Sequence, residues 1–345
     1  MKALVKVAKG EGLVELREVP VPPLPDDHVM IEVKAAGVCG TDLHIFHDLF
    51  PYYPPVVLGH EFSGEIVEVG ARVKGWQVGE RVVAEPHTLA CGVCADCRMG
   101  NLHLCPDRRS IGWGIDGAFA PFLPMPARLL HRIPEGISFD EAALTEPMAV
   151  AVRAVLLNSR VEPGDVVVVQ GPGPIGLLAA MAAKAGGASQ VIVFGAGEDA
   201  KVRLPVASQV GVDHAINLSE LPDAVQFVKD LTDNRGADLV VEAAGVAAAV
   251  VNSIHMVRRQ GRVAVLGLTG KSMIEIPWDV AGFKACEIKF TFSTTYDSWA
   301  RSLSLMESRT IDVRPLITKR APLEEWPAVF EMLENKEGIK CLLIP

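Results

Sequence analysis

Four of the seven cysteines in the chain lie within fifteen residues of one another: Cys91, Cys94, Cys97 and Cys105. Two residues separate the first from the second and the second from the third, so these three thiolates can turn inward on one tight loop. The longer gap to Cys105 lets the fourth thiolate complete a tetrahedron around zinc. A disulfide cluster or a redox pair is the alternative, but the few other cysteines and the lack of a secretory leader favour a metal. The spacing therefore predicts a closed, structural zinc site.

Length, charge and hydropathy narrow the class of protein. At 345 residues the chain has room for about two domains. Its net charge of −9 argues against a nucleic-acid partner, because domains that bind a phosphate backbone are usually basic. No apolar run approaches the roughly 18 residues of a membrane span, and the run Met1–Lys6 contains lysine, which fits a strand better than a signal peptide. We therefore expect a cytoplasmic protein with no nucleic-acid or membrane partner.

The spacing of the apolar residues in the first part of the chain indicates a mostly β domain. From Met1 to about Val150, short β-rich runs such as Val29–Val33 and Gly64–Val69 are broken by Gly, Pro and Asp. This pattern predicts a compact β domain over residues 1–150.

The pattern of apolar residues changes near Ala151. Apolar runs alternate with helical stretches, the runs being 166–169, 191–194, 239–241 and 263–266. Near-continuous apolar strands separated by helices predict a parallel sheet covered on both faces, hence an α/β fold, with a cofactor domain over residues 151–288. The alternation is expected to stop after about residue 290. Residues 289–345 end in a strand-like run, Leu342–Ile344, that can rejoin the first domain.

A glycine motif follows the first apolar run of the second domain. It reads Gly171-Pro172-Gly173-Pro174-Ile175-Gly176 and precedes a helix expected over Leu177–Ala185. In the pattern G-x-G-x-x-G the first glycine permits a tight turn, the second lets the backbone approach a pyrophosphate, and the third lets helix pack on strand. Because strand, loop, helix and next strand occur in this order, the motif predicts a dinucleotide site and not merely a structural turn.

The acidic residue that usually ends the second strand of such a unit is missing. Gly195 stands there, with Glu198 and Asp199 close behind it. Either carboxylate can bind the ribose hydroxyls of NAD or repel the 2′-phosphate of NADP. Lys201 and Arg203 can instead attract that phosphate. The sequence therefore favours NAD as the cofactor and leaves NADP as the alternative. The residues expected to line the cofactor outside the motif are Gly195, Glu198, Arg203, Leu266 and Gly267.

A third group of residues offers ligands for a second metal ion. Cys39, His60 and Glu146 supply a thiolate, an imidazole and a carboxylate, and Glu61 adjoins the histidine. A catalytic zinc needs about three protein ligands and one exchangeable position. Each of these residues could equally have a structural role, so spacing alone does not decide between a metal site and a structural role.

Taken together, the motifs resemble those of a known family. The runs Cys39-Gly40-Thr41-Asp42-Leu43-His44 and Gly59-His60-Glu61, the four-cysteine lobe and the glycine motif are similar to those of the zinc-dependent medium-chain alcohol dehydrogenases, across essentially the whole chain. Glu146-Pro147-Met148-Ala149-Val150-Ala151 resembles the branch with sorbitol, threonine and butanediol dehydrogenases. The resemblance implies a GroES-like catalytic domain interrupted by a Rossmann cofactor domain, with a cleft between them for cofactor and catalytic zinc.

The resemblance also implies which side chains hold the catalytic zinc. Cys39 and His60 correspond to zinc ligands, while Glu61 and Glu146 correspond to carboxylates that share or exchange the remaining protein position. Two zinc ions per chain are therefore expected, one structural and one catalytic, and the catalytic ion would lower the pKa of an alcohol.

A proton relay is implied in the same way. Thr41 and His44, two and five residues after Cys39, match the positions that carry the alcohol's proton to solvent while hydride passes to nicotinamide. His47 lies off this spacing and is expected in the pocket or at the surface.

The substrate is less constrained. In the sorbitol dehydrogenases an arginine usually follows the last strands of the cofactor domain, but the corresponding run 290–296 has none and does not match the threonine dehydrogenases either. Its hydroxyl groups, Ser293 among them, suit a polar alcohol. Phe46, Phe50 and Trp113 are candidates for the pocket wall, with core or surface roles equally open.

These observations favour a zinc-dependent oxidoreductase that moves a hydride from a secondary alcohol to NAD(P), the alcohol being a polyol, a sugar acid or a similar small polar molecule. Threonine 3-dehydrogenase or butanediol dehydrogenase activity is the nearest alternative. A non-catalytic zinc- and nucleotide-binding protein is the alternative of another class, but such a module has no need of a Thr41 and His44 relay. A homo-oligomer, either a dimer or a homotetramer, is expected.

Overall fold

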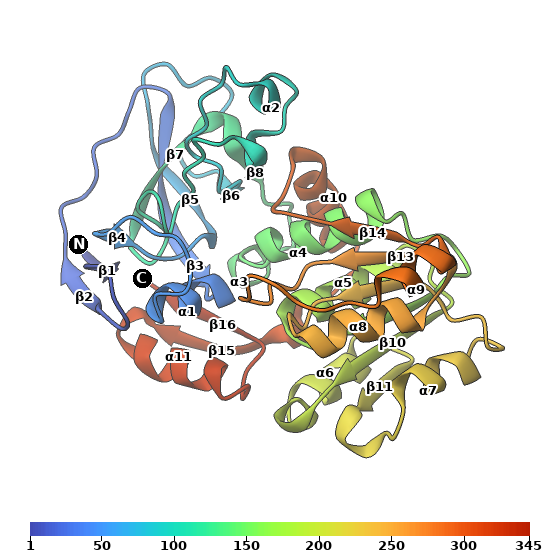
Figure 1. The fold of residues 1–345 in the computed structure, drawn as a ribbon. Helices are drawn as coiled ribbons and strands as arrows, with labels where there is room; N and C mark the ends of the chain where they lie inside the picture. Colours follow the sequence, from blue (N-terminus) through green and yellow to red (C-terminus); the bar gives the residue numbers. More distant parts are fainter.

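The computed structural model describes residues 1–345 and shows two lobes side by side (Figure 1). The lobe that contains both termini is built on a seven-stranded sheet in the order β15-β16-β3-β5-β6-β8, with β7 paired to β3. The strands of this sheet are β3 (His28–Gly37), β5 (Glu61–Val69), β6 (Arg81–Ala84), β7 (Phe122–Pro126), β8 (Leu130–Arg132), β15 (Ile317–Pro322) and β16 (Lys340–Ile344). A small antiparallel sheet beside it contains β1 (Lys2–Lys6), β2 (Val14–Glu18) and β4 (Val56–Val57).

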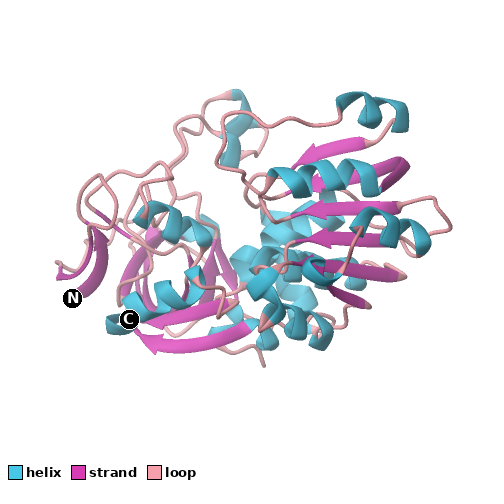
Figure 2. Cartoon of the chain, turned by 60° about the horizontal axis from the view of Figure 1, so that its bottom comes forward, coloured by secondary structure: helices cyan, strands magenta, loops and turns pink.

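The second lobe is a parallel sheet in the order β11-β10-β9-β12-β13-β14, whose strands lie one above another in Figure 2. Its strands are β9 (Val166–Gln170), β10 (Gln190–Gly195), β11 (His214–Asn217), β12 (Ala237–Glu242), β13 (Val257–Val265) and β14 (Glu287–Phe290). The four predicted apolar runs form strands of this sheet, the last of them only as far as Val265, which confirms the α/β fold class.

The helices divide between the lobes. They are α1 (Gly40–Phe46), α2 (Ala95–Arg98), α3 (Phe139–Ala142), α4 (Thr145–Val152), α5 (Pro174–Ala185), α6 (Arg203–Gln209), α7 (Ala224–Asp230), α8 (Ala247–Met256), α9 (Trp278–Lys284), α10 (Tyr296–Glu307) and α11 (Trp326–Glu334). A π-helical turn, Arg153–Asn158, continues α4. None of the helices has the length and apolar character needed to span a bilayer.

Both faces of the parallel sheet are buried, as the unbroken apolar runs predict. Along β9, Val167 and Val169 join the apolar cluster that includes α4 and α5, whereas Val166 and Val168 join the cluster on the other face, with residues of α7 and α8. Successive side chains of a strand point to opposite faces, so a strand covered by helices on both sides has to be apolar at every position.

The chain returns to the first lobe at its end. Strand β16 pairs antiparallel with β3, Leu342 opposite Gly37, so the expectation for Leu342–Ile344 is confirmed. The alternation does not stop after residue 290, however, because α10, β15, α11 and β16 continue it. The division expected at residue 288 falls inside β14, which extends the cofactor sheet to Phe290.

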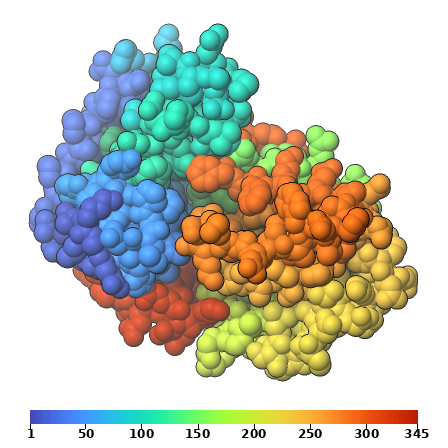
Figure 3. Space-filling view, viewed as in Figure 1, coloured from blue at the N-terminus to red at the C-terminus, as the bar shows by residue number.

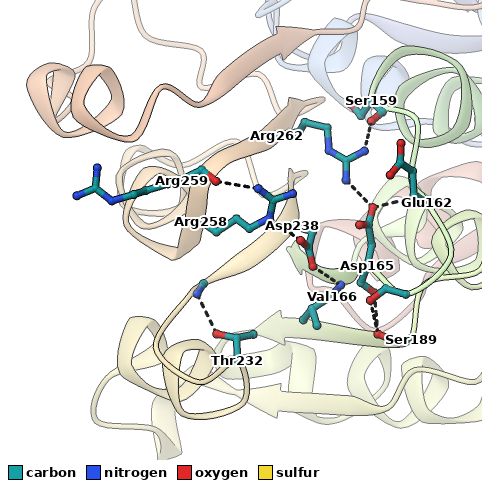
Figure 4. Close-up of polar contacts among 12 residues, drawn as sticks. Ser159, Glu162, Asp165, Val166, Ser189, Thr232, Asp238, Arg258, Arg259 and Arg262 are labelled. Carbon is teal, nitrogen blue, oxygen red and sulfur yellow. Dashed lines mark hydrogen bonds and ion pairs between the residues drawn. The ribbon is translucent and has the colours of Figure 1, made fainter.

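Ion pairs hold the amino ends of the parallel strands (Figure 4). Arg262 donates to Asp165 Oδ2 at 2.5 Å, and Arg258 Nε donates to Asp238 Oδ1 at 2.5 Å. The other oxygen of Asp238 accepts the N–H of Val166 at 2.8 Å, which ties β12 to the first residue of β9. These contacts stabilise the edge of the sheet formed by the amino ends of the strands. Parallel sheets bind ligands at the opposite edge, at the carboxyl ends of their strands.

Candidate functional site

The candidate metal centre begins at the amino end of α1. Cys39 is the N-cap of this helix, and its backbone N–H donates to Asp42 Oδ2 at 2.9 Å. The Thr41 hydroxyl oxygen lies 3.8 Å from Cys39 Sγ. The cap therefore fixes the direction of the thiol and places a hydroxyl beside it.

The second part of the centre is the turn into β5. Gly59 has φ +90°, and a Cβ there would lie 2.7 Å from the Phe119 ring, so the turn requires glycine. His60 and Glu61 follow, and their ligand atoms lie within 4.8 Å of each other and of Cys39 Sγ. His60 Nδ1 is buried without a hydrogen-bond partner, 3.8 Å from Asp42 Oδ1. A thiol, an imidazole with a free buried nitrogen and a carboxylate form a donor set that fits zinc.

The electrostatics of this centre favour a cation. Burial disfavours a charged His60, yet the Cys39 thiolate and the Asp42 and Glu146 carboxylates outweigh burial and raise the pKa of His60 to about 10. Burial raises the pKa of Glu146 to about 7, and the Glu61 carboxylate adds to that rise while His60 opposes it. A divalent cation would satisfy the same negative groups and displace the imidazole proton.

A buried ion pair lies behind the centre. Lys340 Nζ donates to both carboxylate oxygens of Glu61, at 2.6 and 2.9 Å, and to the carbonyl of Val38 at 3.1 Å. The side chains of Lys340 and Glu61 are only 2% and 1% exposed. Glu61 is thus held by an ammonium group, whereas Glu146, on α4, is close enough to influence His60.

The two residues assigned to proton transfer lie on α1. Thr41 is partly buried and His44 is exposed. Residues three apart on a helix are neighbours on one face, so α1 leads from the thiol side of the centre to solvent. His47 is bonded to Glu334 at 2.5 Å and to Glu11 at 3.3 Å, which raises its pKa and places it outside this path.

The four clustered cysteines converge in the loop around α2. Their sulfur atoms lie within 4.8 Å of one another, and Cys91 Sγ is 4.0 Å from Cys97 Sγ, too far for a disulfide. The backbone N–H groups of Val93 and Cys94 lower the pKa of Cys91 to about 7. Burial, together with the neighbouring thiols, raises the pKa of Cys97 to about 12. Several thiolates this close together repel one another, and a bound cation would remove that repulsion.

The glycine motif connects β9 to α5. Gly171 has φ +99° and lies against the backbone of Ala244, and a Cβ on Gly176 would be 1.9 Å from the Gly171 carbonyl oxygen. A Cβ on Gly173 would meet nothing within 4 Å. The first and third glycines are therefore required by packing, and the second leaves room for a ligand. The helix begins at Pro174, earlier than expected, because Gly173 is its N-cap and proline is favoured in the first turn.

At the end of β10 the charged residues are already paired. Arg203 donates to Asp199 Oδ1 at 3.2 Å and to the Gly338 carbonyl at 3.3 Å, and Lys201 pairs with Glu198 at 2.5 Å. Asp199 also caps its own turn through the N–H of Ala196. Arg203, one of the two cations that could attract a 2′-phosphate, therefore already has Asp199 and the Gly338 carbonyl as partners.

Two more cofactor candidates, Leu266 and Gly267, directly follow β13, and both donate their N–H groups to the carbonyl of Glu242 at the carboxyl end of β12. Burial raises the pKa of the Glu242 carboxyl, which accepts the N–H groups of Ala244 and Gly245. These residues border the same sheet edge as the glycine motif.

The residues proposed for the pocket wall differ in where they lie. Phe46 packs edge-on against the rings of Trp326 and Phe330, so it belongs to the core of the first lobe. The rings of Phe50 and Trp113 lie 6.0 Å apart between centroids. The Ser293 carbonyl accepts a hydrogen bond from Arg153 at 3.2 Å. In Figure 3, orange residues of the second lobe face blue residues of the first lobe across a recess.

Sequence reasoning missed three charged residues around the centre. Asp42 belongs to a sequence motif, and its place three residues after the N-cap Cys39 is typical of a capping contact. Lys340 is 279 residues away from Glu61 in the sequence, so no local pattern indicates their pairing. Arg108 lies between the rings of Trp113 and Phe292 and has no motif to mark it.

Comparison with known proteins agrees with the geometry. Residues 25–135 match the family described as "Alcohol dehydrogenase GroES-like domain", and residues 174–308 match "Zinc-binding dehydrogenase". The chain is 39% identical to a sorbitol dehydrogenase of Halalkalibacterium halodurans and 39% identical to an L-threonine 3-dehydrogenase of Bacillus licheniformis, covering 100% of this chain and 99% of each relative. A Sinorhizobium meliloti structure described as a zinc-binding dehydrogenase bound to NADP superposes with a TM-score of 0.93 at 31% identity, covering 100% of this chain and 99% of that one.

The chain therefore belongs to the zinc-dependent medium-chain alcohol dehydrogenase family. It is an NAD(P)-dependent oxidoreductase, as the sequence analysis concluded.

Proposed function

We propose that the chain oxidises a secondary hydroxyl of a small polyhydroxy compound, a polyol or sugar acid, at the centre formed by Cys39, His60, Glu61 and Glu146. The observation that supports this most is the convergence of the thiol, imidazole and carboxylate atoms within 4.8 Å, in a buried place whose charges favour a cation. Zinc held by these residues would supply a Lewis acid that lowers the pKa of an alcohol, and a nicotinamide dinucleotide whose pyrophosphate is held at the glycine motif would supply the hydride acceptor.

The protein's part is to hold the ligands in place. Asp42 accepts the N–H groups of Cys39 and Gly59 and faces His60 Nδ1, so one carboxylate orients both the thiol and the imidazole. Partners of this kind fix the orientation and protonation of metal ligands. Lys340 competes for Glu61, so we infer that Glu61 and Glu146 exchange the remaining protein position.

Proton release would follow α1. The Thr41 hydroxyl, next to Cys39 Sγ, can take the proton from the alcohol, and His44, one turn further along the exposed face, can deliver it to solvent. Both groups come from the same helix whose N-cap is the thiol, so their placement is coupled to that of the metal ligand.

We infer that NAD is preferred over NADP. The surface beside the end of β10 is lined by Glu198, Glu334, Glu337 and Lys336. Arg203 is occupied by Asp199, so carboxylates dominate near the adenosine ribose position. A 2′-phosphate placed among them is disfavoured by like-charge repulsion.

We also propose that the chain forms a homo-oligomer through β14. This strand is the edge of the parallel sheet, and the large apolar side chains of Trp278, Phe283 and Phe290 around it are 71%, 78% and 77% exposed. An edge strand with exposed apolar side chains favours pairing with another strand. The free thiols of both candidate zinc centres suit the reducing conditions of the cytoplasm, our proposed location.

A panel of alcohols tests the proposal. Zinc-loaded protein is assayed with sorbitol, gluconate, 2,3-butanediol and L-threonine, each with NAD and with NADP, by the absorbance of the reduced nicotinamide. We expect the highest kcat/KM for a polyol or sugar acid with NAD. Best turnover of threonine or butanediol would replace the substrate class, and no zinc-dependent turnover of any alcohol would contradict the proposed centre.

A further inference from the structure

Arg108 occupies an unusual position between the two lobes. It follows the last of the clustered cysteines and is partly buried, and its Nε donates to Ser110 Oγ at 3.1 Å. Its guanidinium carbon lies 5.6 Å from the centroid of the Trp113 ring and 5.1 Å from that of Phe292. Trp113 belongs to the first lobe and Phe292 follows β14, so the cation lies over one aromatic ring from each side of the junction.

Most donors of this guanidinium have no protein acceptor. An arginine carries five N–H donors, and Nε is the one that bonds to protein here; no carboxylate oxygen lies within 4.0 Å. Arg153 provides the contrast, because it donates to the carbonyls of Phe292 and Ser293 and to His103 Nε2. Arg153 therefore fixes the loop that presents Phe292, whereas the donors of Arg108 remain available to a ligand.

The surroundings of Arg108 contain few competing charges. Burial lowers the pKa of His87 to about 3, and the Arg108 charge lowers it further. Burial likewise lowers the pKa of His103 to about 4, so both imidazoles on this side are neutral. The carboxylate that interacts with Arg108 is Glu146, which opposes the effect of burial on the arginine pKa. Arg108 thus shares its surroundings with a candidate ligand of the reactive centre.

We propose that Arg108 binds an oxyanion on the substrate, so that the substrate is an alcohol carrying a carboxylate or a phosphate and not a neutral polyol. This inference rests on the function proposed above and specifies its substrate class. A planar guanidinium binds either oxyanion through two parallel N–H donors, and a partly buried one gains more from this contact than an exposed one. A neutral polyol has only hydroxyl oxygens to offer and brings no negative charge to the free N–H donors of Arg108.

The test uses holoenzyme with zinc and NAD, and three variants. Arg108→Gln removes the charge, Arg108→Lys keeps it without the planar fork, and Arg98→Gln removes an exposed arginine of the same cysteine loop as the control. Sorbitol is compared with sorbitol 6-phosphate, with gluconate and with L-threonine, which separates phosphate from carboxylate as the source of the anion. Steady-state kinetics give kcat and KM, and titration calorimetry in the presence of NADH gives Kd for sorbitol 6-phosphate and gluconate.

We expect at least one anionic compound to exceed sorbitol in kcat/KM by roughly 10- to 100-fold, the range for a hydrogen-bonded charge. Arg108→Gln should remove that preference mainly through KM, Arg108→Lys should keep part of it, and Arg98→Gln should behave as wild type. Equal losses for sorbitol and the anions in Arg108→Gln would overturn the proposal, because the arginine would then act through Glu146. A wild-type preference for sorbitol would overturn it as well.

Failure of the proposed function gives a different result. If no alcohol is oxidised, weakening of the calorimetric Kd for either anion in Arg108→Gln still supports the anion site. Absence of anion binding to the wild type would contradict it.

Discussion

The two candidate zinc centres differ in what surrounds their ligands. The cysteine cluster is a local structure: four thiols from one loop, with backbone N–H groups donating to the sulfur atoms and Cys105 alone buried. The Cys39 and His60 centre draws its ligands from distant parts of the chain and is backed by two buried charged residues, Asp42 and Lys340. A closed set of like ligands suits structure, and a mixed, charge-balanced set suits chemistry.

The strongest test of this contrast is Cys39→Ser. Loss of the thiolate from the mixed centre should lower turnover by about 10³-fold or more, because Lewis acidity contributes several kcal/mol to such reactions. Circular dichroism and NADH binding should stay close to wild type, since the glycine motif is in the other lobe. A variant that retains more than a tenth of wild-type kcat would show that the reaction does not depend on this centre.

The Lys340 and Glu61 pair sharpens the comparison. Lys340→Met leaves Glu61 as an unpaired buried charge, so the metal-free protein should lose about 3–5 kcal/mol of unfolding free energy in urea. Zinc-loaded protein should lose less, because the metal can take over the carboxylate, and Glu61→Gln in the same chain should restore part of the loss. Equal losses with and without zinc would mean that Glu61 never contacts the metal.

His44→Ala tests the path along α1. Turnover should fall roughly 10- to 100-fold near neutral pH, the low end of what general acid–base catalysis contributes. The deficit should shrink at higher pH or with imidazole buffer, because solvent base then accepts the proton from Thr41. His47→Ala is the matched control on the same helix end. An unchanged pH profile in His44→Ala would leave Thr41 releasing its proton through water.

Cys94→Ser should have the smallest effect on turnover. The cysteine cluster has no contact with the mixed centre, so we expect kcat within a few-fold of wild type while the thermal midpoint falls, since a structural zinc stabilises the fold around it. Differential scanning calorimetry and initial rates at low temperature separate the two effects. A collapse of kcat with an unchanged midpoint would reverse the roles of the two centres.

What the sequence predicted best is what depends on local spacing. The cysteine cluster, the glycine motif and the apolar strands each follow from a few neighbouring residues, and the comparisons with relatives confirm the family and fold class that were read from them. Contacts between distant segments were not predictable. Lys340 reaches Glu61, 279 residues away in the sequence, only because β16 returns to pair with β3.

The residues of the substrate pocket could not be fixed from the sequence for the same reason. The sequence left pocket, core and surface roles open for Phe46, and only the packing of α1 against Trp326 and Phe330 places its ring in the core. No sequence pattern indicates that Arg108 lies over the rings of Trp113 and Phe292, because only the assembled lobes bring these three residues together.

Metal content of three proteins tests the account of two centres most directly. Protein purified with zinc present and analysed by inductively coupled plasma mass spectrometry should contain about two zinc ions per wild-type chain. Cys39→Ser and Cys94→Ser should each retain about one, the first folded but inactive and the second active but less stable. A value near one in the wild type, or the loss of both ions from either variant, would contradict two independent centres with different roles.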